Sequence, residues 1–192
     1  MKVRLPSRLR RPLLIGCGVL LVVGTTACGR VSNPSSEEND GVYEQGGNIT
    51  YQLQVSRQLN PYSTEDSQYV KGMPPSDAKL LAAQLWYGVF MWAKNQTQSD
   101  QTTTSNFDIV DTTGRHYYPL PVSKTLNPYA WESQKLSPDS IEPSPNTTAY
   151  FGPTQGGLLL FKLSDAVYSN RPLTLEIRSP SGTVQATISL DL

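Results

Sequence analysis

The sequence predicts an all-β fold, an antiparallel β-sandwich with one short helix and a long Pro-rich loop. Short segments that alternate apolar and polar residues recur along residues 48–192 and are separated by turn residues, which is typical of sandwiches and barrels. Only residues 76–84 combine a capping residue with helix-forming composition. Six prolines lie between Pro119 and Thr147 and leave little room for a strand ladder there. We therefore expect one domain of about 145 residues.

The first element along the chain is an export signal. Five basic residues and no acidic residue precede an apolar run that begins at Leu13. The run has the length of the shortest transmembrane helices, about 17 to 18 residues, so an uncleaved anchor is one alternative. However, Thr25-Thr-Ala-Cys28 resembles the lipobox of bacterial lipoproteins, in which the Cys is diacylated and becomes the new N-terminus. Leu14-Ile-Gly-Cys17 also fits that pattern, but almost no apolar segment precedes it.

We therefore predict a lipoprotein signal peptide over residues 1–27 and a lipid anchor on Cys28 at the extracytoplasmic face of the cell membrane. Five of the 16 basic residues and none of the 16 acidic residues precede Cys28, so cleavage leaves 11 bases against 16 acids. A net charge of −5 disfavours nucleic acid as a partner. Both cysteines lie in the signal region, so a disulfide or a thiolate metal site is not expected in the mature domain.

The segment after the anchor, residues 28–47, is rich in Ser, Gly, Asn and Glu and predicts a flexible tether. We expect strands in the domain at residues 49–55, 85–95, 107–111, 116–118, 148–151, 157–163, 173–177 and 184–190. The last two alternate apolar and polar residues and flank Ser179-Pro-Ser-Gly182, which predicts a terminal hairpin with one solvent-facing side.

The strand expected at residues 85–95 is apolar on both faces. Leu85, Tyr87, Val89, Met91 and Ala93 alternate with Trp86, Phe90 and Trp92. Burial of a large apolar side chain contributes roughly 1.5 to 3 kcal/mol, so the aromatic face needs a cover. Either the Pro-rich segment or the predicted helix forms a second core over it, or the face binds a partner or an apolar envelope molecule. Combining both, we expect a binding surface bordered by Trp86, Phe90, Trp92, Tyr129 and Trp131, with the Pro-rich loop as a partial lid.

Three motifs in order resemble a known family. They are Met91-Trp-Ala-Lys-Asn95, then Phe107-Asp-Ile-Val-Asp111-Thr-Thr-Gly114-Arg-His-Tyr117, then Gly156-Gly-Leu-Leu-Leu-Phe161-Lys-Leu. Over residues 86–192 the chain resembles the immunoglobulin-like domain of unknown function of Gram-positive, actinobacterial lipoproteins, which is similar in fold to a mycobacterial secreted immunoprotective antigen. The resemblance implies an immunoglobulin-like sandwich and an envelope location, and it implies no catalytic residues.

Catalytic chemistry has little support in the sequence. The single histidine, His116, could pair with Asp108 or Asp111 in a hairpin, but no Ser or Thr is marked as a nucleophile. One histidine without a mature cysteine is a poor basis for zinc, and a carboxylate pair would need a distant partner such as Glu132 or Glu142. We expect no metal and no cofactor. The prediction is a membrane-anchored binding or interaction module at the cell envelope; the alternatives are a structural or assembly component of an envelope complex and, less favoured, a hydrolase.

Overall fold

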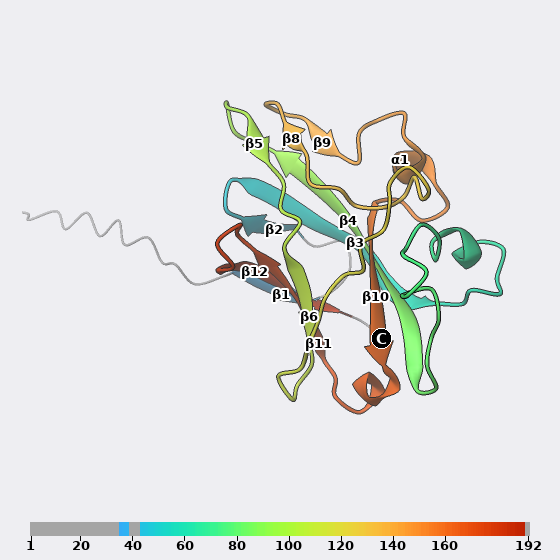
Figure 1. Cartoon of the computed structure of the whole chain (residues 1–192). Helices are drawn as coiled ribbons and strands as arrows, with labels where there is room; N and C mark the ends of the chain where they lie inside the picture. Colours follow the sequence, from blue (N-terminus) through green and yellow to red (C-terminus); the bar gives the residue numbers. More distant parts are fainter. Residues whose placement is uncertain (1–34, 39–42, 191–192) are drawn as a thin grey trace, which may run out of the picture. The chain divides into compact units, whose positions relative to one another are not determined.

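The computed structural model describes residues 35–38 and 43–190, which form two main sheets (Figure 1). The first, here the β12 sheet, has the order β1 (Ser35–Glu38), β12 (Val184–Leu190), β11 (Leu173–Arg178), β6 (Phe107–Val110), β7 (His116–Tyr117). The second, here the β4 sheet, has the order β10 (Gly157–Ser164), β4 (Gln84–Asn95), β3 (Ile49–Leu59), β2 (Tyr43–Gly46), and β9 (Ile141–Glu142) also pairs with β4. All pairings within them are antiparallel except β1 with β12.

Smaller elements complete the described part of the chain. Strands β5 (Gln101–Thr102) and β8 (Lys135–Leu136) pair with each other at the upper end of the molecule in Figure 1, close to β9. One α-helical turn, α1 (Thr148–Phe151), and two 3₁₀ turns, η1 (Asp66–Gln68) and η2 (Asp165–Tyr168), lie in the connections. The β-sandwich predicted from the strand pattern is confirmed.

The main core lies between the two sheets and follows from strand alternation. In β4 the odd-numbered residues from Leu85 to Ala93 are buried in it, opposite Phe107 and Ile109 of β6. The predicted terminal hairpin also forms, since Leu173, Leu175 and Ile177 alternate with half-buried polar residues and pair with β12. Burial of these apolar residues is the main source of the free energy of folding.

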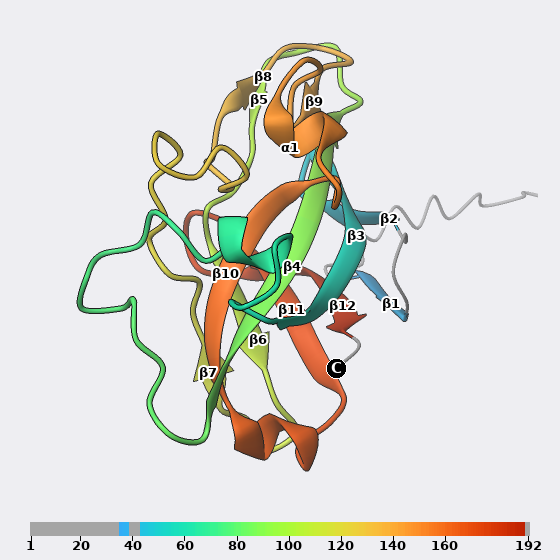
Figure 2. The ribbon, with the colours of Figure 1, turned by 90° about the vertical axis from the view of Figure 1, so that its right-hand side faces the viewer.

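The segments that carry η1 and α1 lie over the outer face of the β4 sheet (Figure 2), where buried side chains form a second core. Trp86 and Phe90 of β4 are buried there by side chains from outside the sheet, chiefly Tyr69 and Tyr129 from loops and Ala149 from α1. The Tyr69 ring packs edge-on against Phe90, with centroids 5.0 Å apart, and against Tyr129, at 4.9 Å. The aromatic face is therefore closed by the chain itself, as one of the two sequence alternatives requires.

One residue of β3 lies on the face opposite to the prediction. Strict alternation places Val55 with Ile49, Tyr51 and Leu53, yet Val55 packs against the second core. The pairing of β3 with β4 shifts register between Leu53 and Val55, and such a bulge moves the following side chains to the other face.

Two predicted elements are wrong. Residues 76–84 are not helical: turns follow Pro74 and Pro75, and Ala83 has a φ of 63°. A nine-residue helix has little stability alone, and here Leu80 instead packs against the second core. Residues 148–151, expected as a strand, form α1. The Pro-rich segment is also less irregular than expected, because it contains β8 and β9.

The predicted tether, residues 28–47, contains two strands. Residues 43–46 form β2, in which Glu44 is buried and pairs with Tyr51, and residues 35–38 form β1 along β12. A tight turn then leads from β2 to β3, where Gly47 has a φ of 68° that favours glycine. The folded part therefore begins before residue 48, and Cys28 lies outside the described residues. Within those residues, no helix is long and apolar enough to span a membrane.

Candidate functional site

The five aromatic residues predicted as a binding surface do not form one. Trp86, Phe90 and Tyr129 are 4%, 0% and 5% exposed in the second core, and Tyr129 is tied further by a 2.8 Å hydrogen bond from its Oη to Gln68. Their burial follows from the closure of the outer face by loops, which the sequence pattern could not show. The Pro-rich segment is thus a packed cover at Tyr129 and not a lid over a free surface.

Trp92 and Trp131 lie apart from these three and from each other. Trp131 packs against the main core, where its ring meets Phe107 edge-on, and its Nε1 donates to the backbone carbonyl of Thr104 at 2.9 Å. Trp92 is half-buried beside Tyr150, and its Nε1 is buried without a hydrogen-bond partner among the described residues. Trp92 borders a small hollow of about 180 Å³ that also includes Tyr43 and Lys94.

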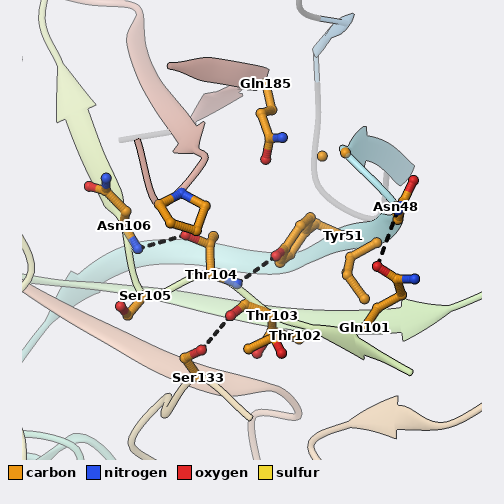
Figure 3. A pocket seen from close by; sticks show the side chains of 14 residues that line it. Asn48, Tyr51, Gln101, Thr102, Thr103, Thr104, Ser105, Asn106, Ser133 and Gln185 are labelled. Atoms are coloured by element: carbon orange, nitrogen blue, oxygen red, sulfur yellow. Dashed lines mark hydrogen bonds between the residues drawn. The ribbon is translucent and has the colours of Figure 1, made fainter. Parts of the chain in front are cut away.

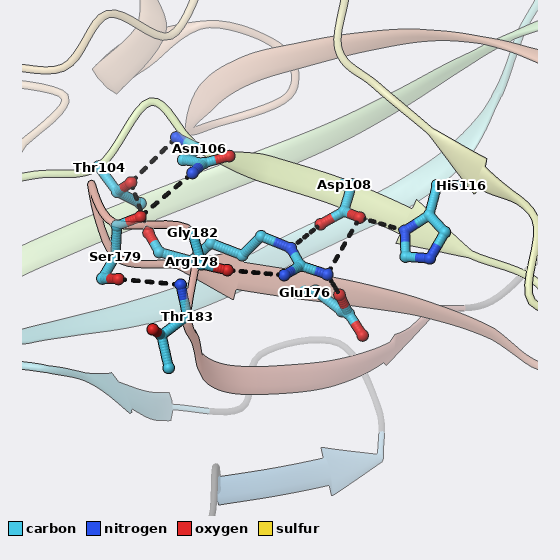
Figure 4. Close-up of polar contacts among 9 residues, drawn as sticks. All are labelled: Thr104, Asn106, Asp108, His116, Glu176, Arg178, Ser179, Gly182 and Thr183. Atoms are coloured by element: carbon cyan, nitrogen blue, oxygen red, sulfur yellow. Dashed lines mark hydrogen bonds and ion pairs between the residues drawn. The ribbon is translucent and has the colours of Figure 1, made fainter.

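A charged cluster, defined here as Asp108, His116, Glu176 and Arg178, lies on the β12 sheet (Figure 4). The side chain of Asp108 is 2% exposed, and its Oδ1 accepts from Arg178 Nε at 2.7 Å. His116 Nδ1 contacts the other carboxylate oxygen of Asp108, and Arg178 Nη2 contacts Glu176. Hydrogen bonding to Asp108, with the nearby charges of both carboxylates, raises the pKa of Arg178. The sequence predicted that His116 pairs with Asp108 or Asp111, and in the structure it pairs with Asp108.

The members of the charged cluster bind one another. The potential ligand atoms of Asp108, His116 and Glu176 lie within 4.8 Å of one another, as a metal site would need, but the guanidinium of Arg178 already supplies the positive charge between the carboxylates. Among the described residues, no hydroxyl group hydrogen-bonds to His116 as a nucleophile would. Asp111 instead stabilises the β6–β7 turn, accepting from the N–H groups of Thr113 and Arg115. Burial opposes its ionisation, but hydrogen bonds from Thr113, Arg115 and Tyr117 lower its pKa to about 2.

A pocket of about 650 Å³, here the end pocket, is lined mostly by residues with polar side chains (Figure 3). Its walls come from four places far apart in sequence: the β2–β3 turn with the start of β3, strand β5 with the irregular run that follows it, Ser133 in the Pro-rich segment, and the start of β12 with the turn before it. The lining residues are Gly46, Gly47, Asn48, Ile49, Tyr51, Gln101, Thr102, Thr103, Thr104, Ser105, Asn106, Ser133, Pro180 and Gln185. None of them carries a charge.

Buried hydrogen bonds hold the back wall of the end pocket in place. The Thr104 backbone N–H donates to Tyr51 Oη at 2.8 Å, and its Oγ1 donates to the Arg178 carbonyl at 2.7 Å. Thr103 Oγ1 donates to the buried carboxylate of Glu142 at 2.9 Å. Burial, opposed by the Thr104 N–H and reinforced by the charge of Glu142, raises the pKa of Tyr51 to about 12, so the phenol stays neutral at physiological pH. The wall is therefore rigid and electrically neutral where it faces the cavity.

Other side chains of the end pocket have donor and acceptor groups that bind no other described residue. Within the described part of the chain, Thr102, Ser105 and Gln185 make no side-chain hydrogen bond, although each can donate and accept. In Figure 3, Asn106 and Asn48 stand on two sides of the cavity, and Gln185 approaches between them from β12. A Cβ built on Gly47 would come within 2.8 Å of Gln185 Nε2, so the turn and the amide lie against each other.

No part of the end pocket is predicted as a site from the sequence. Gln185 falls on the solvent-facing side of the predicted terminal hairpin, and the run Gln101-Thr-Thr-Thr-Ser-Asn106 falls between two predicted strands. Six consecutive uncharged residues that can all donate and accept hydrogen bonds were the one available signal. The approach of Gln185, 79 residues beyond Asn106, could not be inferred from spacing.

Comparison with known proteins adds no functional assignment. No family model and no curated protein matches the chain. Among solved structures, the yjhA protein from Bacillus subtilis is similar over 82% of this chain and 99% of its own, with 11% identity and a TM-score of 0.48. A "putative lipoprotein (ycdA)" from Bacillus subtilis subsp. subtilis str. 168 is similar over 80% of this chain and 38% of its own, at 9% identity and a TM-score of 0.46.

A third similar structure is an uncharacterized beta-sandwich protein from Clostridium difficile 630, over 83% of this chain and 97% of that one, at 9% identity and a TM-score of 0.43. At these identities and TM-scores we draw no functional conclusion from the likeness. One of these neighbours is described as a β-sandwich protein and another as a putative lipoprotein. The resemblance to the actinobacterial lipoprotein domain stays a prediction.

Proposed function

We propose that this chain is a lipoprotein anchored through Cys28 at the extracytoplasmic face of the cell membrane, and that its β-sandwich is a binding module of the cell envelope. The observation that carries the proposal is the end pocket, a cavity of about 650 Å³ with a fixed wall and unused hydrogen-bonding groups. Its volume falls in the range of about 300 to 1,000 Å³ that small-molecule sites occupy. The lipobox-like residues before Cys28 support the anchor.

The geometry favours binding over hydrolysis. A hydrolase built on His116 needs a free imidazole with a nucleophile on one nitrogen and an orienting carboxylate on the other. Here the orienting carboxylate of Asp108 is shared with Arg178, and the charged cluster does not belong to the lining of the end pocket. The unused groups of the end pocket, by contrast, are arranged around an open cavity where a ligand can reach them.

The anchor is tested by fractionating cells that produce the full chain. Cys28→Ala should move the protein from the membrane fraction to the soluble fraction, because the acyl chains are lost, whereas Cys17→Ala should leave it in the membrane. If Cys28→Ala stays membrane-bound while Cys17→Ala is released, the anchor lies at Cys17. If both variants stay membrane-bound, an uncleaved helix holds the chain.

The binding role is tested by placing a photoreactive amino acid at Thr102, an exposed residue of the end pocket, in intact cells. Thr112, equally classed as exposed but located on the β6–β7 turn, is the matched control position. A binding module should give a discrete adduct from Thr102 and none from Thr112. Absence of any adduct at Thr102 would contradict the proposal, and a stoichiometric protein adduct from both positions would favour the structural or assembly alternative.

A further inference from the structure

The ligand class follows from three properties of the end pocket, and the inference rests on the proposed function. We propose that the end pocket binds an uncharged oligosaccharide, which hydrogen-bonds to the side chains of Thr102, Ser105 and Gln185.

The first property is the absence of charge from the lining, which consists of amides, hydroxyls, one buried Tyr, two Gly, one Ile and one Pro. Transfer of an ionised ligand out of water is costly unless an opposite charge faces it. The two buried carboxylates nearest in the bonding network are committed, Glu142 to Thr103 and Asp108 to Arg178. Anionic sugars, nucleotides and charged peptides therefore find no counterion in this lining.

The second property is the supply of groups that both donate and accept. Hydroxyl and carboxamide groups offer both functions, and so does every hydroxyl of a sugar. A purely apolar ligand would cover Thr102, Ser105 and Gln185 without replacing their hydrogen bonds to water, and each such loss costs about 1 to 3 kcal/mol. A polyhydroxylated ligand exchanges those bonds one for one, so it fits the lining better than the apolar envelope molecule considered from the sequence.

The third property is the shape of the walls. A peptide commonly binds by adding a strand to an open sheet edge, where the main chain supplies the hydrogen bonds. Here the walls are two turns, the start of β3, Ser133, the irregular run 103–106 and the two-residue strand β5, which already pairs with β8. The backbone N–H groups of Thr103 and Thr104 already donate to Gln134 O and Tyr51 Oη. Recognition is left mainly to side chains. Since Tyr51 is 2% exposed and forms part of the wall, hydrogen bonds rather than ring stacking carry the affinity.

The structure supplies a local reporter for the test. The indole N–H of Trp131 donates to the Thr104 carbonyl, directly behind the pocket wall, whereas Trp86 lies in the second core and Trp92 beside Tyr150. We would titrate the ¹⁵N-labelled full chain in detergent micelles with tri-N-acetylchitotriose and with maltotriose. The Trp131 indole resonance and the Gln185 side-chain amide should shift saturably with at least one of them, and the Trp86 and Trp92 indole resonances should stay in place.

Variants assign the site. Gln185→Ala and Ser105→Ala should each weaken saccharide binding about three- to tenfold, since each removes a hydrogen bond between neutral groups. Gln98→Ala, which changes an exposed glutamine outside the pocket, should leave binding unchanged. Trigalacturonic acid, an anionic trisaccharide, should bind at least tenfold more weakly than the neutral sugars.

The proposal is overturned if neither neutral trisaccharide moves the Trp131 indole resonance, or if trigalacturonic acid binds as well as they do. It is also overturned if a blocked, uncharged tetrapeptide of Ala and Gly binds the pocket in their place. In each of these cases an adduct from the photoreactive residue at Thr102 still upholds the binding module with a ligand of another class. If the Thr102 adduct is also absent, the proposed function as a binding module is contradicted.

Discussion

The end pocket and the charged cluster are two neighbouring polar regions of the sandwich, and they are joined at Arg178, whose carbonyl accepts from Thr104 while its guanidinium binds Asp108. In the charged cluster every charged side chain has a partner within the cluster: Asp108 of β6 binds His116 of β7 and Arg178 of β11, and Arg178 also binds Glu176 of its own strand. In the end pocket, the side chains of Thr102, Ser105 and Gln185 face the cavity and have no hydrogen-bond partner among the described residues. The difference indicates that the charged cluster, although it contains more reactive residue types, stabilises the β12 sheet. The end pocket, which has no charged residue in its lining, is the place where a ligand can be recognised.

The largest effect is expected from Arg178→Ala, which leaves the buried Asp108 without its guanidinium. Removal of one partner of a buried ion pair typically costs about 3 to 5 kcal/mol of stability, and part of that loss is expected here because the Arg178 side chain is 23% exposed. Chemical denaturation would measure it. Lys135→Ala, which breaks the exposed pair with Asp100, is the control and should cost less than about 1 kcal/mol. Equal losses would show that the cluster is not a structural unit.

Glu142 gives the next largest effect, and it depends on pH. Burial outweighs its hydrogen bonds and the charge of Lys124, and raises the pKa of Glu142 from about 4.5 to about 7. The folded state therefore holds a proton that the unfolded chain releases between pH 4.5 and 7, so stability falls as the pH rises through this window. The full loss above pH 7 is roughly 3 kcal/mol.

Glu142→Gln should remove that slope and make the protein more stable at pH 8, by up to roughly 3 kcal/mol, because the amide stays neutral and its oxygen can still accept from Thr103. Urea denaturation at pH 5 and pH 8 measures the change. Glu132→Gln, at an exposed position of the same Pro-rich segment, should leave the slope unchanged. A wild-type protein whose stability is flat between pH 5 and 8 would contradict the assignment.

Trp131→Phe tests the boundary between the main core and the end pocket. The change keeps an aromatic ring against Phe107 but removes the donor to the Thr104 carbonyl, which should cost about 1 to 2 kcal/mol and weaken saccharide binding. Thermal denaturation and the sugar titration check both effects. If stability falls but affinity does not, the indole N–H does not position the pocket wall.

The smallest effect on stability is expected from the double variant Thr102→Ala and Gln185→Ala. Neither side chain bonds another described residue, so the free energy of unfolding should change by no more than about 0.5 kcal/mol while binding is lost. This is the opposite of Arg178→Ala, which should reduce stability more than binding. A double variant that destabilises the fold by more than about 2 kcal/mol would place these residues in the structural framework and remove the contrast between the two regions.

Much of the sandwich follows from local pattern. The alternation in residues 85–95 assigns the two faces of β4 correctly, and the alternation after Leu173 with the Ser179–Gly182 turn correctly gives the terminal hairpin. Such alternation is local because successive side chains of a strand point to opposite faces. Alternation gives the wrong face where strand pairing is irregular. At Val55, a register shift in the pairing of β3 with β4 moves the side chain to the opposite face of the sheet.

Where the local sequence pattern is weak, tertiary contacts determine the secondary structure. Residues 76–84 have helical composition, but Leu80 packs against the second core. A short isolated helix has too little stability to compete with this packing. Residues 43–46 have the composition of a linker, yet they pair with β3 because an edge strand gains its hydrogen bonds from its neighbour and not from its own sequence.

The sequence by itself determined the β-rich class of the domain, the two apolar faces of β4 and the terminal hairpin, because each rests on neighbouring residues within one strand or turn. Only the tertiary structure decided what covers Trp86 and Phe90, and which polar groups remain unbonded. The end pocket brings Gly47, Ser105 and Gln185 together across two sheets. The physical reason is that closure of a face and saturation of hydrogen bonds are set by contacts between segments far apart in the chain, which no local pattern encodes.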